Sequence, residues 1–303
     1  MLKFLYALNF SLVRKKTSGN FLWTIKYIFL RKVANIFVKF YYKFPYKKIG
    51  INKTIKREKK YIVSLTTFPG RINVVWIAIE SLLRQRFKPD EIILWLAKEQ
   101  FNGLEDIPIE IIKQQERGLT IRFCDDLRSH KKYYYAFKEF SEDVIITVDD
   151  DVIYPNNTLE VLVGLHKKHP NCICSNRAHV ITKKEDNLID SYNRWVNNPR
   201  GFQGPSKLLC PTGVSGVLYP PNSVDREIFN KESIKNLCFY ADDLWLKIMS
   251  LKKGTHVVKS ASFPDDLFTI ESSQNESLGS INVAENKNDE QLQAILRKYD
   301  ISL

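Results

Sequence analysis

Short apolar runs alternate with longer amphipathic segments along most of the chain. The apolar runs have the length of buried strands and lie at 61–67, 91–97, 119–126, 144–150 and 171–177. Between them, apolar residues recur every three or four positions, as in helices that bury one face, at about 73–86, 130–140 and 158–169. Strands and helices that alternate at this spacing predict βαβ units, and therefore an α/β fold with a mostly parallel central sheet.

Polar residues collect where the predicted strands end. The segments concerned are TTFPGR (66–71), CDDLRSHKK (124–132) and DDD (149–151). In a parallel sheet the carboxyl ends of the strands lie along one rim, and ligands bind beyond that rim. We therefore expect these three segments to be neighbours in space, although they are far apart in the sequence.

The run of three aspartates needs a physical explanation, because Asp149, Asp150 and Asp151 end an apolar strand. Two like charges about 6.5 Å apart repel by roughly 2.5 kcal/mol at an effective dielectric constant near 20. Water, a cationic side chain or a metal ion must offset that repulsion. Side chains alternate along a strand, so we expect Asp149 and Asp151 to share one side while Asp150 points away.

A pair of carboxylates at a binding rim suits a hard cation such as Mg2+ or Mn2+. Mg2+ takes one or two carboxylates and completes its octahedron with phosphate oxygens and water. The pair Asp149 and Asp151 therefore predicts a site for a metal–diphosphate complex. A solvated turn is the usual alternative for an isolated pair of aspartates, but this pair lies at the predicted binding rim.

The positive charge of the chain is confined to its beginning. The net charge is +12, but residues 1–60 hold 16 Lys and Arg against one acid, so the remaining residues have a net charge of −3. A basic segment of this kind favours a polyanionic partner, either nucleic acid or an anionic membrane surface. The slightly acidic remainder argues against nucleic acid as a substrate.

Residues 20–43 combine this charge with bulky apolar side chains. At 100° per residue most of their polar side chains fall on one face, namely Asn20, Arg31, Lys32, Asn35, Lys39 and Lys43. No uncharged apolar run is long enough to span a bilayer, so the pattern is typical of a helix that lies on a membrane surface. The alternative is a helix that packs on the main domain or on a partner chain, and nucleic acid ranks third because aliphatic side chains dominate. We expect residues 52–60, which are mostly polar, to be a loose linker.

The cysteines show little sign of a metal or disulfide framework. There are five, scattered along the chain without a Cys-x-x-Cys pair. This pattern disfavours zinc ribbons and disulfide-rich folds, and it favours a reducing compartment such as the cytoplasm.

An ordered set of segments between residues 61 and 260 resembles the GT-A glycosyltransferases of the family 2-like group. The segments are YIVSLTTFPGRI, IESLLRQRFKPDEIILWLA, VIITVDDDVIYP, SNRAHVI, PTGVSGVLYPP and YADDLWLKIMS. Their set is similar to that of bacterial glycosyltransferases of capsule and lipopolysaccharide loci. The resemblance implies a Rossmann-like GT-A fold and metal-dependent transfer of a sugar, with Mn2+ or Mg2+, from a nucleotide-diphosphate donor to a glycan or lipid-linked acceptor. It also implies a role in surface polysaccharide synthesis, and with the basic segment it predicts peripheral association with the inner face of the cell membrane.

The resemblance also assigns residues to the donor site. It places the nucleotide and its phosphates near Thr66, Thr67, Phe68, Arg71, Asp126, Lys131, Lys132, Asp149 and Asp150. Arg71 would reach a phosphate, and Lys131 and Lys132 would lie near a helix N-terminus, where basic residues suit an anion. A solvated surface is the alternative for the two lysines. Similar enzymes place an acid after the second strand, whereas this chain has LAKEQF there, so Glu99 or Asp126 is expected to take that role.

Group transfer also needs a carboxylate that takes the proton of the acceptor hydroxyl. The segment YADDLWLKI supplies Asp242 and Asp243. It resembles the Glu-Asp-x-x-Leu segment of inverting family 2-like enzymes, with Asp242 in the Glu position. That match makes Asp243 the catalytic base and Asp242 its catalytic neighbour. The alternative is a pair of aspartates that caps the helix beginning there.

Three further features stay open. The glycines of PTGVSGVLYPP suit either a close approach of the backbone to a sugar or a plain turn. Tyr192 and Trp195 suit stacking on an acceptor sugar or packing in the core. His179 and His256 are candidates for extra metal ligands, although a lone histidine is more often structural.

Two other functional classes compete with the glycosyltransferase. A sugar nucleotidyltransferase or a two-metal phosphoryl-transfer enzyme would also use the acids, but the former needs a Gly-rich loop after the first strand, which TTFPGRI is not. A non-catalytic module tethered to a membrane is the other class. In all cases we expect three parts: a basic amphipathic segment (1–60), a catalytic domain (61–265) and a polar tail with a short helix (266–303).

Overall fold

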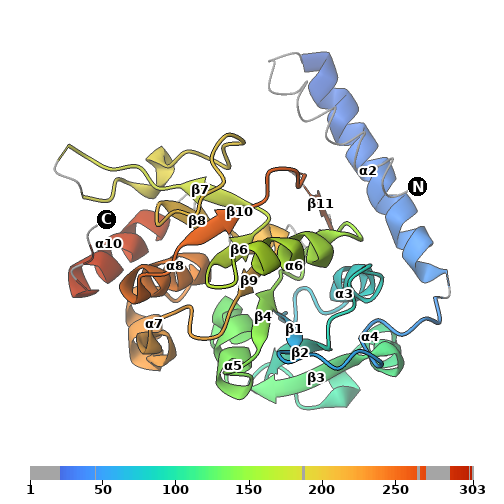
Figure 1. The fold of residues 1–303 in the computed structure, drawn as a ribbon. Coiled ribbons are helices and arrows are strands. Elements are labelled where there is room, and N and C mark those ends of the chain that lie inside the picture. Colours follow the sequence, from blue (N-terminus) through green and yellow to red (C-terminus); the bar gives the residue numbers. More distant parts are fainter. Residues whose placement is uncertain are drawn as a thin grey trace.

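The computed structural model describes residues 21–44, 46–185, 188–264, 267–270, 287–299 and 301 (Figure 1). Within these residues one sheet has the strand order β10-β6-β9-β4-β1-β2-β3. Its strands are β1 (Tyr61–Thr66), β2 (Glu91–Ala97), β3 (Leu119–Cys124), β4 (Val144–Thr147), β6 (Ile173–Ser175), β9 (Val217–Tyr219) and β10 (Val257–Lys259). All neighbouring strands are parallel except β9, which runs antiparallel to β4 and β6. The predicted α/β fold with a mostly parallel sheet is therefore confirmed.

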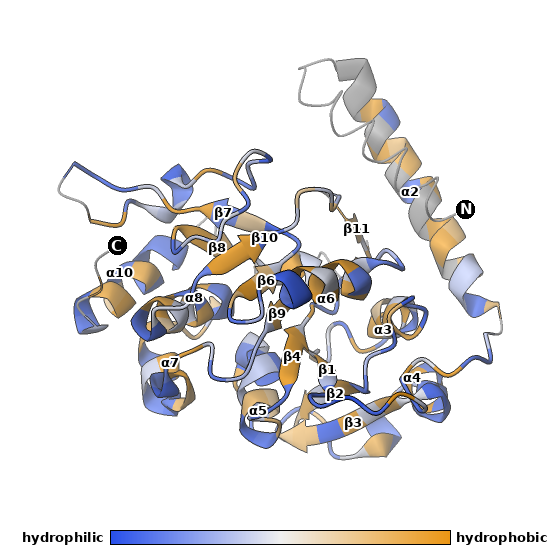
Figure 2. Cartoon of the chain, viewed as in Figure 1, coloured by the Kyte–Doolittle hydropathy of each residue, from blue (hydrophilic) through white to orange (hydrophobic). Residues whose placement is uncertain are grey.

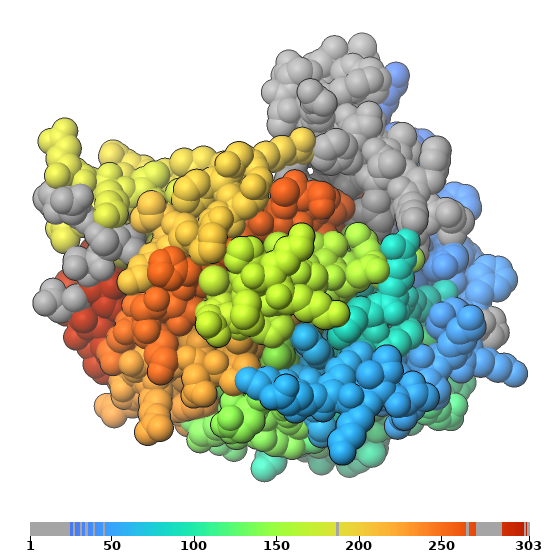
Figure 3. All heavy atoms as spheres, in the orientation of Figure 1, coloured from blue at the N-terminus to red at the C-terminus, as the bar shows by residue number. Residues whose placement is uncertain are grey.

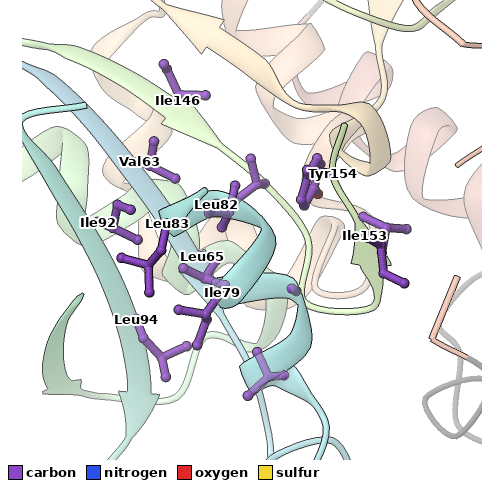
Figure 4. Close-up of a cluster of buried hydrophobic side chains, with 14 of the residues drawn as sticks. Val63, Leu65, Ile79, Leu82, Leu83, Ile92, Leu94, Ile146, Ile153 and Tyr154 are labelled. Atoms are coloured by element: carbon purple, nitrogen blue, oxygen red, sulfur yellow. The ribbon is translucent and has the colours of Figure 1, made fainter. Parts of the chain in front are cut away.

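Helices cover both faces of this sheet, because its strands bury side chains on both sides. The helices are α3 (Val75–Leu83), α4 (Ile109–Gln114), α5 (Lys131–Glu139), α6 (Thr158–Lys168), α7 (Lys231–Leu237) and α8 (Asp242–Lys253). Val63 and Leu65 of β1 belong to the buried cluster that includes α3 and α6, whereas Ile62 packs with Ala136 of α5. Figure 4 shows the α3 side chains, such as Leu82, lying over the strands. This two-sided burial explains why the strands are uninterrupted apolar runs.

Smaller elements connect these strands and helices. Two antiparallel pairs are β5 (Val152–Ile153) with β11 (Phe268–Thr269), and β7 (Ala178–Val180) with β8 (Leu209–Pro211). Short 3-10 turns are η1 (Leu104–Asp106), η2 (Gln115–Arg117), η3 (Arg128–His130), η4 (Tyr192–Arg194), η5 (Gly213–Ser215) and η6 (Arg226–Phe229). The helix expected in the tail is α10 (Lys287–Tyr299), which packs on α7 and α8. Residues 271–286 of the predicted tail lie outside the described residues, and the borders of the three parts stay a prediction.

The amphipathic segment forms helix α2 (Phe21–Lys43), which runs along one edge of the molecule (Figure 1). Its C-terminal end is fixed to the body of the molecule by Arg84, which follows the last residue of α3. The Arg84 guanidinium donates to the backbone carbonyl of Phe44 at 3.1 Å and pairs with Glu80 at 2.7 Å. It also lies 4.9 Å from the ring centroid of Tyr42, which is buried. Among the described helices, none has both the length and the apolarity needed to cross a bilayer; residues 1–20 lie outside the described part.

The segment after α2 is not the loose linker that we expected from its polar sequence. Asp90 gathers three donors from it: the Asn52 amide at 2.7 Å, the Arg57 guanidinium at 2.7 Å and the backbone N–H of Tyr61 at 2.8 Å. In Figure 3 the blue segment lies directly against the body of the molecule. The prediction was wrong because acids distant in the sequence, Asp90 and also Asp143, which accepts the Lys60 N–H at 2.8 Å, hold this segment in place.

Candidate active site

A polar cavity of about 410 Å³ lies beyond the carboxyl ends of β1 and β4. One side is formed by the end of β1, the loop after β4 and the first turn of α5. The other side is formed by β7, β8, the first turn of α8 and the start of α10. The three rim segments expected to be neighbours each contribute at least one residue to this cavity, among them Arg71, Lys132 and Asp149.

The three aspartates lie in a loop, because β4 ends at Thr147. The Arg71 guanidinium lies 2.6 Å from the Asp150 carboxylate and 3.2 Å from that of Asp151. Asp150 also accepts a hydrogen bond from the Thr67 hydroxyl at 2.6 Å. The alternation expected for a strand is therefore not followed, and two adjacent aspartates share one cation.

Asp149 turns toward a different cation, Lys132 of α5. The Lys132 Nζ lies 2.7 Å from Asp149 Oδ1 and 2.8 Å from Asp242 Oδ2. Burial alone would lower the pKa of Lys132, but the nearby carboxylates raise it well above its ordinary value. Lys132 therefore stays charged and joins the loop after β4 to the first turn of α8.

Asp242 and Asp243 begin α8, but neither caps it. The N-cap residue is Ala241, and no side chain caps the helix there. Asp243 instead accepts the backbone N–H of Gly213, with its two oxygens at 3.0 and 3.1 Å from that nitrogen. A Cβ atom on Gly213 would lie 3.0 Å from Lys132 Nζ and 3.2 Å from Asp243 Oδ1. A glycine at this position therefore lets the backbone approach the charged groups closely.

The two aspartates of α8 differ in their ionisation. Burial raises the pKa of Asp243 to about 7, and the charge of Asp242 adds to this effect. Burial also opposes ionisation of Asp242, but the Lys132 ammonium outweighs it and keeps the pKa of Asp242 below its ordinary value. At neutral pH Asp242 is a carboxylate and Asp243 titrates. A carboxylate with a pKa near the working pH is suited to accept a proton from a reacting hydroxyl.

The family model of glycosyl transferase family 2 matches residues 66–218, half of the chain. The chain belongs to this family. As a family 2 glycosyltransferase it is an enzyme that transfers a sugar, and the competing classes of nucleotidyltransferase, phosphoryl-transfer enzyme and non-catalytic module are set aside. The matched residues include the loop of three aspartates, whereas Asp242 and Asp243 lie beyond them.

One solved structure supports the GT-A fold for this glycosyltransferase. The mannosyltransferase PcManGT from Pyrobaculum calidifontis, solved in complex with GDP-Man and Mn2+, has a TM-score of 0.51 at 11% identity, covering 99% of this chain and 77% of its own. At this identity the likeness speaks for the fold alone. The structure of S. aureus TarS 1–349 has a TM-score of 0.41 at 14% identity, covering 67% of this chain and 58% of its own, and nothing is argued from it. No curated protein sequence matches the chain.

Most residues that the sequence singled out meet in the cavity of the glycosyltransferase. Those that line it are Thr66, Arg71, Lys132, Asp149, Asp150, Asp151, Asp242 and Asp243. Thr67 lies behind this lining, bonded to Asp150. Phe68 supports Arg71, whose guanidinium lies 5.5 Å from the centroid of its ring. Their roles in donor binding and catalysis remain predictions.

Lys131 and Asp126 lie apart from the cavity lining. The Lys131 Nζ is 2.5 Å from Asp126 Oδ1, and the Asp126 backbone N–H donates to Glu99 at 3.0 Å. Successive residues of a helix point about 100° apart, so Lys131 and Lys132 face different partners. The two acids proposed for the nucleotide base, Glu99 and Asp126, are thus neighbours.

The features left open by the sequence separate clearly. Tyr192 and His179 line the cavity, whereas Trp195 is buried at 4% exposure and His256 is exposed away from the lining. Packing in the core is therefore the reading for Trp195. Burial lowers the pKa of His179 to about 3, so its ring is neutral at physiological pH.

Sequence reasoning missed several lining residues: Ser129, Arg177, Thr212, Tyr240, Thr269 and Asn288. Arg177 follows β6 and donates to the Thr212 hydroxyl at 3.0 Å. Arg177 had a usable signal, because a charged residue at the carboxyl end of a predicted strand is the cue that selected Arg71. Asn288 had none, since nothing in the sequence shows that α10 reaches the cavity.

The charge of the described cavity lining fits a divalent cation. Its carboxylates are Asp149, Asp150, Asp151, Asp242 and Asp243, and its cationic side chains are Arg71, Lys132 and Arg177. Asp149 and Asp151 keep 28% and 18% of their side chains exposed, although each also pairs with a cation, Lys132 and Arg71 respectively. Among the described residues no group of three or more His, Cys, Asp or Glu is arranged to hold a metal ion. Two carboxylate ligands suit an ion that fills its other positions with phosphate oxygens and water.

Proposed function

We propose that this glycosyltransferase moves a sugar from a nucleotide-diphosphate donor to a hydroxyl of a glycan or lipid-linked acceptor, with inversion at the anomeric carbon. The observation that carries the proposal is Asp243, a carboxylate in the cavity wall whose pKa is raised to about 7. The resemblance of the sequence to enzymes of capsule and lipopolysaccharide loci supports a role in surface polysaccharide synthesis.

In the proposed reaction, the Asp243 carboxylate takes the proton of the acceptor hydroxyl. The hydroxyl oxygen forms a bond to the anomeric carbon, and the bond from that carbon to the diphosphate oxygen breaks on the opposite side. The diphosphate leaves with the electron pair. The charge of Asp242 strengthens the proton affinity of Asp243, and the Gly213 N–H holds the carboxylate in place.

On the donor side, the cavity-lining cations Arg71 and Lys132 would meet the charge that develops on the leaving diphosphate. Asp149 and Asp151 are the residues that would hold a Mn2+ or Mg2+ ion. When bound, the ion supplies positive charge to the departing diphosphate. Thr66 and Phe68 lie at the end of β1, where the nucleotide is expected to bind.

We expect UDP or GDP to bind at least about tenfold more tightly with Mn2+ than with EDTA, because the ion neutralises charge that the acidic cavity otherwise repels. Isothermal titration calorimetry measures both affinities. The double variant Asp149→Asn/Asp151→Asn should lose the difference. The control Asp125→Asn, a carboxylate outside the cavity lining whose side chain is 59% exposed, should keep it. Equal affinities in the unsubstituted enzyme would contradict the donor site.

We further propose that α2 places the enzyme on an anionic membrane surface. Its exposed apolar side chains are Ile25, Ile28, Phe29, Ile36, Phe37 and Phe40. At 100° per residue, Phe29, Ile36 and Phe40 point within about 40° of one another. Exposed lysines on the same helix are Lys26, Lys32 and Lys43. An apolar stripe beside basic side chains is the pattern of a helix that binds anionic lipid (Figure 2).

The double variant Phe29→Ser/Phe40→Ser should lower the fraction of enzyme that sediments with phosphatidylglycerol vesicles. Each buried Phe contributes up to about 1.5–3 kcal/mol, so the partition constant should fall at least tenfold. The control Leu104→Ser/Ile109→Ser changes side chains of similar exposure on the catalytic domain, at 49% and 57%, and should sediment like the parent. If both double variants sediment equally, α2 is not the lipid-binding element.

A further inference from the structure

The side of the cavity that faces away from the aspartate loop is built by residues without a role in the function proposed above. We call it the acceptor-side wall and define it as His179, Tyr192, Tyr240 and Asn288. His179 comes from β7, Tyr192 from η4 and Asn288 from the first turn of α10. Only His179 and Tyr192 lie within the part of the chain that matches the family. This wall is thus assembled in part by elements outside that match.

His179 presents an unusual polar group in this wall. It is 5% exposed, and its Nδ1 has no hydrogen-bond partner among the described residues. Its ring meets that of Tyr192 edge to face, with centroids 6.0 Å apart and planes at 88°. Nδ1 itself is buried, so a ligand in the cavity would contact the part of the imidazole that lines it.

Tyr192 lies between the histidine and the core. Its ring is tilted by 50° against that of Trp195, with centroids 4.9 Å apart, and the Trp195 indole N–H donates to the backbone carbonyl of Asp190 at 3.0 Å. The negative charge of Asp243 contributes, after burial, to raising the pKa of Tyr192. The aromatic ring is therefore held firmly within electrostatic range of the proposed base.

Helix α10 fixes the position of Tyr192. Asp289 accepts the backbone N–H of Tyr192 at 2.5 Å and the hydroxyl of Ser191 at 2.7 Å. One helical position earlier, Asn288 lines the cavity, and Gln291 of the same helix accepts the backbone N–H of Tyr240 at 2.9 Å. These bonds tie both tyrosines of the wall to one helix.

We propose that the acceptor-side wall binds an uncharged sugar residue of the acceptor. In this arrangement Tyr192 packs on the sugar ring, His179 bonds one of its hydroxyls, and Asp289 is the positioning residue that holds Tyr192 in place. The proposal rests on the function proposed above, because it assumes that Asp243 faces the acceptor.

An uncharged sugar fits this wall better than an anionic group. Aromatic side chains offer an apolar face with few polar groups around it, the usual composition of a site for a neutral ligand. Asp243 and Asp289 lie next to the wall and would repel an anion. The nearby cation Arg177 also lines the cavity, where it donates to the Thr212 hydroxyl at 3.0 Å. The imidazole is neutral at physiological pH and bonds a hydroxyl without any change of charge.

The test first identifies a donor by its slow hydrolysis, and then offers p-nitrophenyl glycosides of common neutral hexoses and N-acetylhexosamines as acceptors. Tyr192→Ala and Asp289→Ala should raise the KM for the best glycoside about tenfold or more. The KM for the donor and the rate of donor hydrolysis should change less than twofold. Asp289→Asn keeps one oxygen that can accept a hydrogen bond, so its KM for the glycoside should lie between those of Asp289→Ala and the parent.

Glu290→Gln is the matched control, because this residue is exposed on the same helix and loses the same charge. It should behave like the parent enzyme. The proposal is overturned if Tyr192→Ala and Asp289→Ala leave the KM for the glycoside unchanged, or if no glycoside accepts sugar from an enzyme that hydrolyses its donor. Failure of the proposed function itself looks different: no nucleotide sugar is hydrolysed at all.

Discussion

Asp243→Asn should lower kcat about 10³-fold while nucleotide binding stays within twofold of the parent enzyme. Removing a general base typically costs 10²- to 10⁴-fold in rate, and the amide cannot take the proton of the acceptor hydroxyl. Both oxygens of Asp243 face the Gly213 N–H, and an Asn oxygen can still accept that bond. The loss should therefore be confined to the chemical step. Release of free nucleotide measures the rate, and calorimetry measures binding.

The pH dependence of the parent enzyme should also reflect the ionisation of Asp243. The base must be deprotonated, and its pKa is raised to about 7 by burial and by the charge of Asp242. The value of kcat/KM should therefore fall about tenfold per pH unit below pH 7 and level off above it. If kcat/KM instead stayed constant down to about pH 4, Asp243 would be behaving as an ordinary carboxylate.

The same substitution should stabilise the fold, and this separates loss of function from loss of structure. The pKa of Asp243 is about 7 in the folded enzyme against an ordinary value of 3.8. Between these two values the folded state binds more protons than the unfolded state, so stability falls as pH rises through this window. Above pH 7 the full penalty is present, and Asp243→Asn removes it. At pH 8 the variant should melt at a higher temperature than the parent. The control Asp225→Asn loses a bond to Lys252, which lies on α8 like Asp243, and should not raise the melting temperature.

Lys132→Met should destabilise the enzyme by about 3–5 kcal/mol, the range for breaking a buried ion pair by removing one partner. Lys132 is 4% exposed and lies within 2.8 Å of two carboxylates, Asp149 and Asp242. Met matches the length of the side chain, so the effect comes from the unpaired negative charges. Urea unfolding at pH 8, where the aspartates are ionised, gives the free energy of unfolding.

Lys131→Met is the neighbouring control. Lys131 is equally buried but pairs with one carboxylate, Asp126, whose side chain is 27% exposed and can be solvated. Its loss should therefore cost less than that of Lys132. Adding Asp242→Asn to Lys132→Met should recover part of the stability, because it removes one of the two stranded charges. If the two lysine variants lose the same free energy of unfolding, and Asp242→Asn restores none of it, Lys132 does not stabilise the carboxylates.

The strands and the rim of the site could be predicted because both follow from apolar periodicity. Buried strands of a parallel sheet are uninterrupted apolar runs. Strands β1 to β4 coincide with such runs, and polar residues follow each of them. Arg71 and Lys132 could be assigned to the rim, but not their partners. Those partners depend on the loop after β4, where strand alternation no longer applies.

Tyr192 and His179 could be singled out from the sequence, but not the wall that they form with Tyr240 and Asn288. Residues that form it come from β7, η4 and α10, which are separated by long stretches of chain. Their meeting depends on single bonds such as that from the Tyr192 N–H to Asp289. Neither apolar periodicity nor local residue composition predicts such pairs. The docking of Asn52 and Arg57 on Asp90 escaped prediction in the same way.

The aspartate loop lies within residues 66–218, the span shared with the family, whereas Asp243 and Asn288 come from chain that follows it. Two relatives can therefore agree throughout the shared span and still offer different surfaces to whatever is glycosylated. A match within that span covers the aspartate loop together with His179 and Tyr192, but not Asp243, Tyr240 or Asn288. Proteins found through that match alone therefore need their later segments compared before a shared acceptor is assumed.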